Sequence, residues 1–502
     1  VRFALGSRLL PGRSTQSPTE PHHTLLEMPA ARGQWLAPLA VLASFCGASS
    51  EAELGSFSVY TDTAWLRPGQ VHNAWRTPQR LPEEVLRRFA GRRMLIKAIN
   101  IDIVRICNVT GKEISLPLTE IYNHHFATMF GPLDDLQDLY QRENGSDPLG
   151  PHTARKLAHH GCMMQGAAIN ALLEEVRASG HHDIAAFGGA SGAEFRGTPT
   201  ALPTPYAFAM NITENFAFMA LLHFIDMHGA SDVGHRRFEC PCTKARRFDL
   251  ENGTIDGMRP VPFTCSEELI KQGNPSCSLA TYQGGYRCCE NGVFLTDKIP
   301  GPLARRHPFK AKLTVTYYED LPNPKLAKHV DCCDASGNQT VKGNLEYDVP
   351  QCAPGTPPHL CEHIATSVQP LNLQVGGDRL SNHSRGPPRD PDQLLDLVHA
   401  WGHQHVGSLG MELWNEQTGQ LLCRTQPRIG TGSEAGNEAG FLVGIPPCVW
   451  GPPPLLPPPR LRQGDLLRTV ARYNSSIARR GVMSLWLMEA AEVRADQPDF
   501  LV

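Results

Sequence analysis

The sequence predicts a mainly β protein that contains many short strands. The chain of 502 residues holds 45 glycines and 42 prolines, roughly a sixth of all residues and above ordinary usage. Both residue types favour turns, and an abundance of turns is typical of all-β folds. Several segments also alternate apolar and polar residues, which is the pattern of strands with one buried face.

Three segments show this strand pattern most clearly, one near residue 100, one near residue 315 and one close to the C-terminus. Their predicted faces consist of Ile99, Ile101 and Ile103, of Leu313, Val315 and Tyr317, and of Met483, Leu485 and Leu487 with Ser484, Trp486 and Met488 on the opposite side. One short helical region is expected at residues 165–179, which are rich in Ala, Leu and Glu and are followed by Gly180 as a C-terminal cap. Residues 390–400 fit a helix that starts at Asp390-Pro391 and fit a strand equally well.

The charge balance excludes one class of partner. The 47 basic and 50 acidic residues give a net charge of −3, so no basic excess is present for binding nucleic acid. The hydrophobic fraction of 41% is sufficient for buried cores. A chain of this length suggests about two to four domains.

We expect two structural domains after the N-terminal segments. The chain turns polar near residues 335–345, and we place the boundary there. The N-terminal domain then covers residues 53–335, with a Cys-rich insertion at 235–300. The C-terminal domain covers residues 340–495.

The N-terminus predicts export. Residues 1–27 are polar and are interpreted as an unstructured leader or a gene-model extension. Residues 28–52 resemble a signal peptide, because Met28 and Arg32 precede a short apolar run and a group of small residues. No later stretch approaches about 18 apolar residues, so we expect a secreted protein without a membrane span.

The cysteines and the glycosylation sequences agree with a secreted protein. Beyond Cys46 in the predicted signal peptide, 14 cysteines remain, and an even number in a secreted chain favours disulfides. Cys423 and Cys448 are predicted to pair, because they are the only two cysteines after His405. A group of four cysteines (Cys240, Cys242, Cys288 and Cys289) also fits zinc as an alternative. Asn-x-Ser/Thr sequences, which predict glycosylation, occur at Asn108, Asn144, Asn211, Asn252, Asn338, Asn382 and Asn474.

Histidines supply the candidate chemistry. His403 and His405 are two positions apart, so on a strand both side chains point to one face and can bind the same metal. A structural or surface role for this pair is the alternative. His124 and His125 are adjacent and would bind jointly only at a bulge or a strand end. His223 alone, within an apolar run, is typical of a core histidine, and Met483 alone is typical of a core methionine.

The chain resembles the stress up-regulated nodulin family of plants and algae, the nodulin-nineteen type, over about residues 55–492. The C-terminal matches are the most specific. They comprise His403-Gln-His405-Val-Gly, Gly436-Asn-Glu-Ala-Gly440-Phe-Leu-Val-Gly444, Tyr473-Asn-Ser and Gly481-Val-Met483. The N-terminal matches include Tyr122-Asn-His-His125 and Leu222-His223-Phe-Ile-Asp226.

A more distant resemblance implies copper chemistry. The order His-His, His, His-x-His, Met is similar to that of the copper type II, ascorbate-dependent monooxygenases, such as the peptidylglycine α-hydroxylating and dopamine β-hydroxylating enzymes. The resemblance implies two β-sandwich (jelly-roll-like) domains with one copper each. It implies an electron-relay site at His124, His125 and His223, and an oxygen-binding site at His403, His405 and Met483. A thioether ligand favours Cu(I), and imidazole suits copper in both oxidation states.

The sequence departs from that pattern in two places. Leu221 stands where those enzymes have a glutamine two residues before the relay histidine. Trp486 and Leu487 lie where they have a substrate-pocket tyrosine. The resemblance therefore does not identify a small-molecule or peptide substrate. Two functions follow as expectations: a monooxygenase that uses ascorbate or another reductant, and a non-catalytic extracellular protein associated with copper or the cell wall.

Overall fold

The protein is described by a computed structural model. It describes residues 53–107, 109–144, 184–189, 200–228, 305–336, 347–371, 394–462 and 464–493, together with Arg196 and short strands between residues 240 and 294. The described chain is mainly β, as the sequence predicts, and most of its strands lie in four layers.

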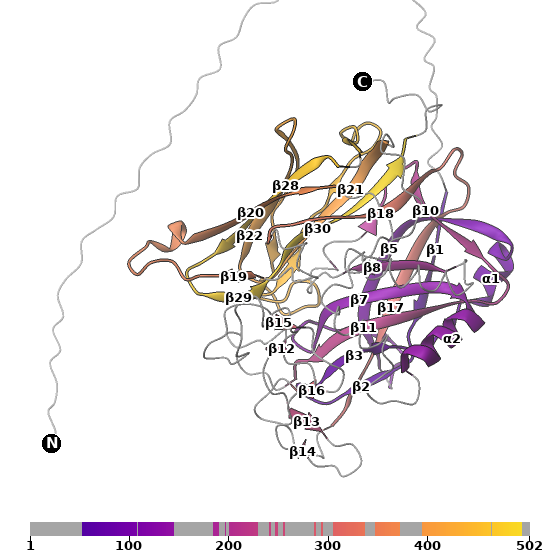
Figure 1. Cartoon of the computed structure of the whole chain (residues 1–502). Coiled ribbons are helices and arrows are strands. Elements are labelled where there is room, and N and C mark those ends of the chain that lie inside the picture. Colours follow the sequence, from indigo (N-terminus) through magenta and orange to yellow (C-terminus); the bar gives the residue numbers. More distant parts are fainter. Residues whose placement is uncertain are drawn as a thin grey trace, which may run out of the picture. The chain divides into compact units, whose positions relative to one another are not determined.

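Two β-sheets form the part of the chain up to residue 318 (Figure 1). The first has the strand order β1-β17-β5-β10, and β2, β6 and β9 pair with β17 or β5. Its strands are β1 (Leu54–Tyr60), β2 (Ala64–Leu66), β5 (Arg92–Ile106), β6 (Glu113–Ser115), β9 (Thr200–Ala201), β10 (Tyr206–Ile212) and β17 (His307–Tyr318). The second sheet has the order β3-β11-β7-β8, and β4 pairs with β11. Its strands are β3 (Val71–Trp75), β4 (Gln79–Arg80), β7 (Ile121–Pro132), β8 (Ala185–Gly189) and β11 (Phe216–Asp226).

The core of this part lies between the two sheets. Every second residue of β11, from Phe216 to Phe224, belongs to one buried cluster. The facing sheet contributes the predicted apolar faces near Ile101 and Val315. Because successive strand residues point to opposite faces, the intervening residues of β11, including Leu221 and His223, lie on the other side of its sheet.

Two short helices accompany these sheets. The helix α1 (Glu83–Phe89) has acidic residues in its first turn and basic residues in its last turn, as the helix dipole favours. The helix α2 (Leu133–Asn144) follows β7 and packs Leu136 and Leu139 on the outer face of β11. The sequence analysis missed both helices, because each has only two or three turns and therefore a short helical pattern of apolar residues. The predicted helix at residues 165–179 lies outside the described residues.

The part of the chain after residue 324 contains two more packed sheets (Figure 1). One has the order β18-β30-β21-β26, with β27 also paired to β21, and the other has the order β20-β28-β22-β23. Their strands are β18 (Lys325–Asp334), β20 (Glu362–Pro370), β21 (Leu394–Gln404), β22 (Ser408–Asn415), β23 (Gln420–Thr425), β26 (Cys448–Val449), β27 (Arg460–Arg462), β28 (Leu466–Asn474) and β30 (Ser484–Glu492). Their core contains Trp486 and Met488 from β30 and Met411 and Leu413 from β22.

Smaller elements complete the described chain. A parallel pairing of β10 with β18, at Tyr206 with Lys325 and at Ala207 with Leu326, joins the first sheets of the two parts into one hydrogen-bonded path. The remaining elements are β12 (Cys240–Pro241), β13 (Arg246–Phe248), β14 (Ile255–Asp256), β15 (Tyr286–Arg287), β16 (Val293–Phe294), β19 (Tyr347–Val349), β24 (Arg428–Ile429), β25 (Leu442–Gly444), β29 (Arg479–Val482) and a 3₁₀ turn at Pro358–Leu360. The domain boundary at residues 335–345 stays a prediction.

Several other predictions can be compared with the described residues. The ambiguous segment at 390–400 becomes strand β21 from Leu394 onward, so its helical alternative is wrong. The predicted disulfide between Cys423 and Cys448 is confirmed, and a second one joins Cys352 to Cys361. None of the helices in the described ranges is long and apolar enough to cross a membrane. The predicted leader and signal peptide lie outside those ranges, as does the Cys-rich insertion apart from its short strands.

Candidate metal-binding sites

His403 and His405 converge at the end of strand β21. Their Nε2 atoms are 3.2 Å apart, and their ring centroids are separated by 5.1 Å with the rings nearly perpendicular. His403 is buried and His405 is half-buried. The predicted i, i+2 geometry is therefore present, and two imidazole nitrogens that face each other at this distance can share either a proton or a cation.

Met483 lies at the same end of the same sheet face. In the pairing of β21 with β30, His403 is opposite Leu485 and Gln404 is opposite Ser484, and His405 and Met483 are the next residues beyond. Met483 is buried in a small cluster with Trp401, Leu485 and Leu487. This cluster occupies the face that carries the two histidines, whereas Trp486 and Met488 point into the core on the other side.

Tyr473 links the backbone of His405 to that of Met483. Its hydroxyl accepts a hydrogen bond from the His405 backbone N–H at 2.8 Å and donates one to the Met483 carbonyl at 2.7 Å. Tyr473 belongs to β28 in the opposite sheet, so its ring spans the interior and is fully buried. Burial raises the pKa of the Tyr473 hydroxyl well above its ordinary value, so the hydroxyl stays protonated and can donate and accept at once.

The structure places His223 opposite a bulge in strand β7. In the pairing of β11 with β7, His223 is opposite His125 and the next residue, Phe224, is opposite Asn123. His124 is therefore the extra residue of a β-bulge, which is the irregularity that joint binding by two adjacent histidines requires. His223 itself is fully buried.

Along β11, the residues on either side of His223 on its sheet face are apolar, whereas the neighbouring strands place Asn73 and His125 opposite it. Leu221 packs with Met219 and Ala217 beneath α2, so the position where the copper enzymes have a glutamine is part of a hydrophobic cluster. On the other side of His223, Ile225 packs with Phe441, a residue of the glycine-rich segment near residues 430–444.

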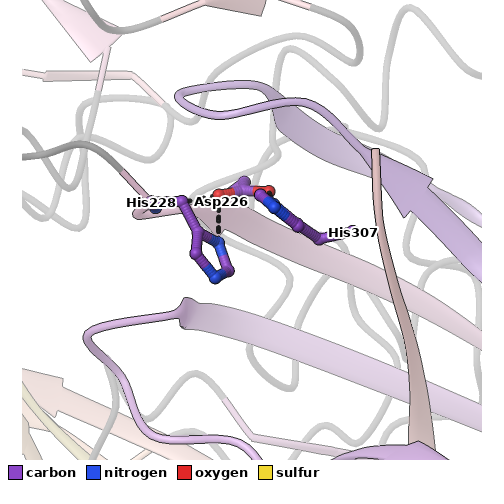
Figure 2. A group of neighbouring side chains, drawn as sticks. All are labelled: Asp226, His228 and His307. Carbon is purple, nitrogen blue, oxygen red and sulfur yellow. Dashed lines mark hydrogen bonds and ion pairs between the residues drawn. The ribbon is translucent and has the colours of Figure 1, made fainter. Parts of the chain in front are cut away.

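A third group of histidines, which the sequence analysis did not single out, surrounds Asp226 at the end of β11. Figure 2 shows the carboxylate of Asp226 between the rings of His228 and His307. Its two oxygens lie 2.8 Å from the Nδ1 atoms of His228 and His307, respectively. The two rings stack with their centroids 3.7 Å apart. Each of the three residues offers one ligand atom such that these atoms all lie within 4.8 Å of one another.

The carboxylate of Asp226 is completely buried, whereas the side chains of His228 and His307 are 30% and 22% exposed. The hydrogen bond to Asp226 is the main reason that the pKa of His228 lies above its ordinary value, and burial opposes it. A second carboxylate, from Glu120, lies 3.6 Å from His228 Nε2 and is paired with Arg105.

A local signal for part of this group was present in the sequence. Asp226 and His228 are two residues apart, which is the same spacing that drew attention to His403 and His405. His307 is 81 positions away from Asp226, and only the packing of the two sheets that contain β11 and β17 brings it close. No spacing rule reaches across such a distance.

Comparison with known proteins supports one family. Residues 389–493 match the family model described as stress up-regulated Nod 19. The matched segment contains His403, His405, Met483 and Tyr473. No curated protein matches the chain.

Proposed function

We propose that the chain is a secreted glycoprotein of the stress up-regulated nodulin family that binds copper at two sites. One site consists of His403, His405 and Met483, and the other of His124, His125 and His223. The observation that carries the proposal is the convergence of the His403 and His405 Nε2 atoms to 3.2 Å at the sheet end where Met483 lies. Secretion and glycosylation rest on the sequence patterns alone.

The residues present fit copper chemically. Two imidazoles and one thioether form a donor set that suits Cu(I), and an all-imidazole set suits both oxidation states. Tyr473 would keep the first set assembled, because it holds the backbones of His405 and Met483 to a single hydroxyl group. The bulge at His124 is the backbone irregularity that joint binding by two adjacent histidines requires, and it lies opposite His223.

The activity that follows is a reductant-dependent monooxygenase acting on a C–H bond. When bound, copper would supply one-electron chemistry with oxygen. The protein would contribute a half-buried imidazole, His405, where substrate can approach, and a buried apolar cluster around Met483 that excludes water from the other side. The departures at Leu221 and Trp486 leave the substrate class open and favour, as the second candidate, a non-catalytic extracellular copper or cell-wall protein.

Copper loading tests the first part of the proposal. Purified protein is titrated anaerobically with Cu(I) against a competing chelator, and bound copper is measured by elemental analysis. We expect two equivalents for the wild type and one for His405→Gln or for His223→Gln. The control His359→Gln, which changes an exposed histidine, should keep both. Less than one equivalent in the wild type would contradict copper binding.

Oxygen uptake separates the two candidate functions. Copper-loaded protein is mixed with ascorbate, and oxygen consumption is followed with and without extracts that contain candidate substrates. Consumption that His405→Gln abolishes and His359→Gln preserves would support the monooxygenase. Full copper loading with no consumption above that of the His405→Gln variant would support the non-catalytic function.

A further inference from the structure

We propose that Asp226, His228 and His307 form a third metal site, selective for a divalent ion such as Zn²⁺. This site uses none of the residues assigned to copper above. It would hold together the end of β11 and the beginning of β17.

The geometry needs only a small adjustment to bind an ion. The ligand atoms already lie within 4.8 Å of one another, and the contacts between Nδ1 and carboxylate oxygen atoms are 2.8 Å. Zinc bonds of about 2.0–2.1 Å in a tetrahedron separate ligand atoms by about 3.3 Å. The contacts between nitrogen and oxygen would open by roughly half an ångström, and the two imidazole nitrogens, which lie within 4.8 Å of each other, would move to the same spacing. The side chains of His228 and His307 are partly exposed and can move in this way.

The charges favour a cation at this point. Asp226 is a buried carboxylate, and Glu120 adds a second carboxylate near His228 with Arg105 as its cationic partner. A buried charge requires compensation, and the two imidazole rings, whose centroids lie 3.7 Å apart, present nitrogen ligands to one cation beside Asp226. A divalent ion bound by two neutral imidazoles and the Asp226 carboxylate would compensate the buried charge and leave one net positive charge, next to which the Glu120 carboxylate lies.

The donor set selects the ion. Two imidazoles and one carboxylate are ligands that zinc commonly uses with an open fourth position. The set contains no thiolate or thioether, the soft donors that select Cu(I). We therefore expect Zn²⁺ to bind here under reducing conditions in which Cu(I) occupies the other sites.

The position of the group suggests a structural role for the ion. His228 lies two residues after the end of β11, and His307 is the first residue of β17. The chain between them contains the predicted Cys-rich insertion. The ion would therefore hold the two ends of this long insertion close to each other. Closing a loop of this length removes more entropy from the unfolded chain than closing a short one.

Zinc binding to the purified full chain tests the proposal. The protein is first loaded with Cu(I), then dialysed anaerobically against Zn²⁺, and both metals are measured by elemental analysis. We expect one zinc equivalent in the wild type and a loss of zinc affinity of roughly 100-fold or more in His228→Gln/His307→Gln, since ligand removal exceeds the loss caused by changing an outer partner. His359→Gln should bind zinc as the wild type does.

A second measurement guards against a folding defect. Circular dichroism should show the native β-rich spectrum for the double variant. If the double variant does not fold, the single variant His228→Gln, which changes the most exposed of the three side chains, is used in its place. The melting temperature of the wild type should rise with zinc concentration, because an ion that binds only the folded state stabilises it, and that of the variant should not. Equal zinc uptake by wild type and variant would overturn the proposal and leave a hydrogen-bonded triad.

The outcome is independent of the copper proposal. The variant His403→Gln/His405→Gln should keep its zinc equivalent and lose one copper. The variant His228→Gln/His307→Gln should keep both coppers and lose its zinc. Failure of one pattern therefore does not imply failure of the other.

Discussion

At the scale of single residues, His403 and His405 show what spacing can and cannot predict. Their i, i+2 spacing predicts two imidazoles on one strand face, and the Nε2 atoms meet at 3.2 Å. The sequence analysis names Tyr473 only as part of a family match and does not anticipate its role, because its hydroxyl reaches His405 from another sheet and from 68 positions along the chain. A residue that positions a site from across a sandwich leaves no local pattern.

Changing Tyr473 to phenylalanine should weaken both the fold and the copper site. The substitution Tyr473→Phe removes the hydroxyl that bonds both the N–H of His405 and the carbonyl of Met483, at a cost of about 1–3 kcal/mol. The Met483 carbonyl keeps its hydrogen bond from the Ser484 hydroxyl. We expect a lower free energy of unfolding in urea and a lower Cu(I) affinity. Tyr347→Phe is the matched control, because the Tyr347 hydroxyl bonds to Ser484 and to neither of those residues. Equal effects of the two substitutions on Cu(I) affinity would contradict a positioning role for Tyr473.

His72 makes a separate prediction about acid stability. Burial, together with the nearby charge of Arg76, lowers the pKa of His72 to about 3. Above pH 6.5 the imidazole is neutral in both folded and unfolded chains. As the pH falls from 6.5 toward 3, only the unfolded chain takes up this proton, so stability is lost over that range.

The substitution His72→Leu should remove this part of the pH dependence. Between pH 7 and pH 5, His72 should account for a loss of about 2 kcal/mol in the free energy of unfolding of the wild type. Urea titrations at both pH values should show a drop smaller by that amount in the variant. Identical drops in the two proteins would show that His72 does not titrate as described.

At the scale of elements, the bulge in β7 is the most informative feature. Because His124 and His125 are adjacent, they can bind one metal together only at a bulge or a strand end. Their adjacency does not tell whether a bulge is present. The answer depends on the register with β11, where His223 and Phe224 face His125 and Asn123. Register is set by tertiary pairing, and therefore the sequence alone could not supply it.

The alternating strands were predictable and the helices were not. Ile101 and Val315 lie in the core as their alternation predicts. The segment around Asp396 and Ala400 fits both periods, and pairing with β30 on one side and β27 on the other makes it a strand. The helices α1 and α2 are too short for their periodicity to outweigh the surrounding strand pattern.

The Cys423–Cys448 disulfide should stabilise the part of the chain after residue 324 more than the Cys352–Cys361 disulfide does. The first closes a separation of 25 residues and the second a separation of 9. In the chain-entropy model, removing them costs roughly 3.5 and 2.5 kcal/mol, respectively. Urea unfolding of Cys423→Ala/Cys448→Ala and of Cys352→Ala/Cys361→Ala measures both. A larger loss in the second variant would contradict the loop-length argument.

At the scale of the whole molecule, contacts between distant segments were the least predictable. The buried carboxylate of Glu438 accepts hydrogen bonds from the backbone N–H groups of Leu118 and Gly436 and pairs with Arg196. Phe441 packs against Tyr122 in the same region. The sequence shows the glycine-rich segment near residues 430–444 but does not show that it contacts Leu118, Tyr122 and Arg196. The same holds for Asp226 and His307, whose contact depends on how the sheet that contains β11 packs against the sheet that contains β17.

The copper assignment of the site formed by His403, His405 and Met483 is tested most directly by Met483→Leu, with Met488→Leu as the control on the opposite face of β30. Both changes keep volume and apolarity, so each should cost less than about 1.5 kcal/mol of stability. Cu(I) and Cu(II) affinities are measured by competition titration for the wild type and both variants. We predict that Met483→Leu lowers Cu(I) affinity more than Cu(II) affinity, since only the soft sulfur is lost, and that Met488→Leu changes neither. Unchanged Cu(I) affinity in Met483→Leu would contradict the account and make Met483 a core residue alone.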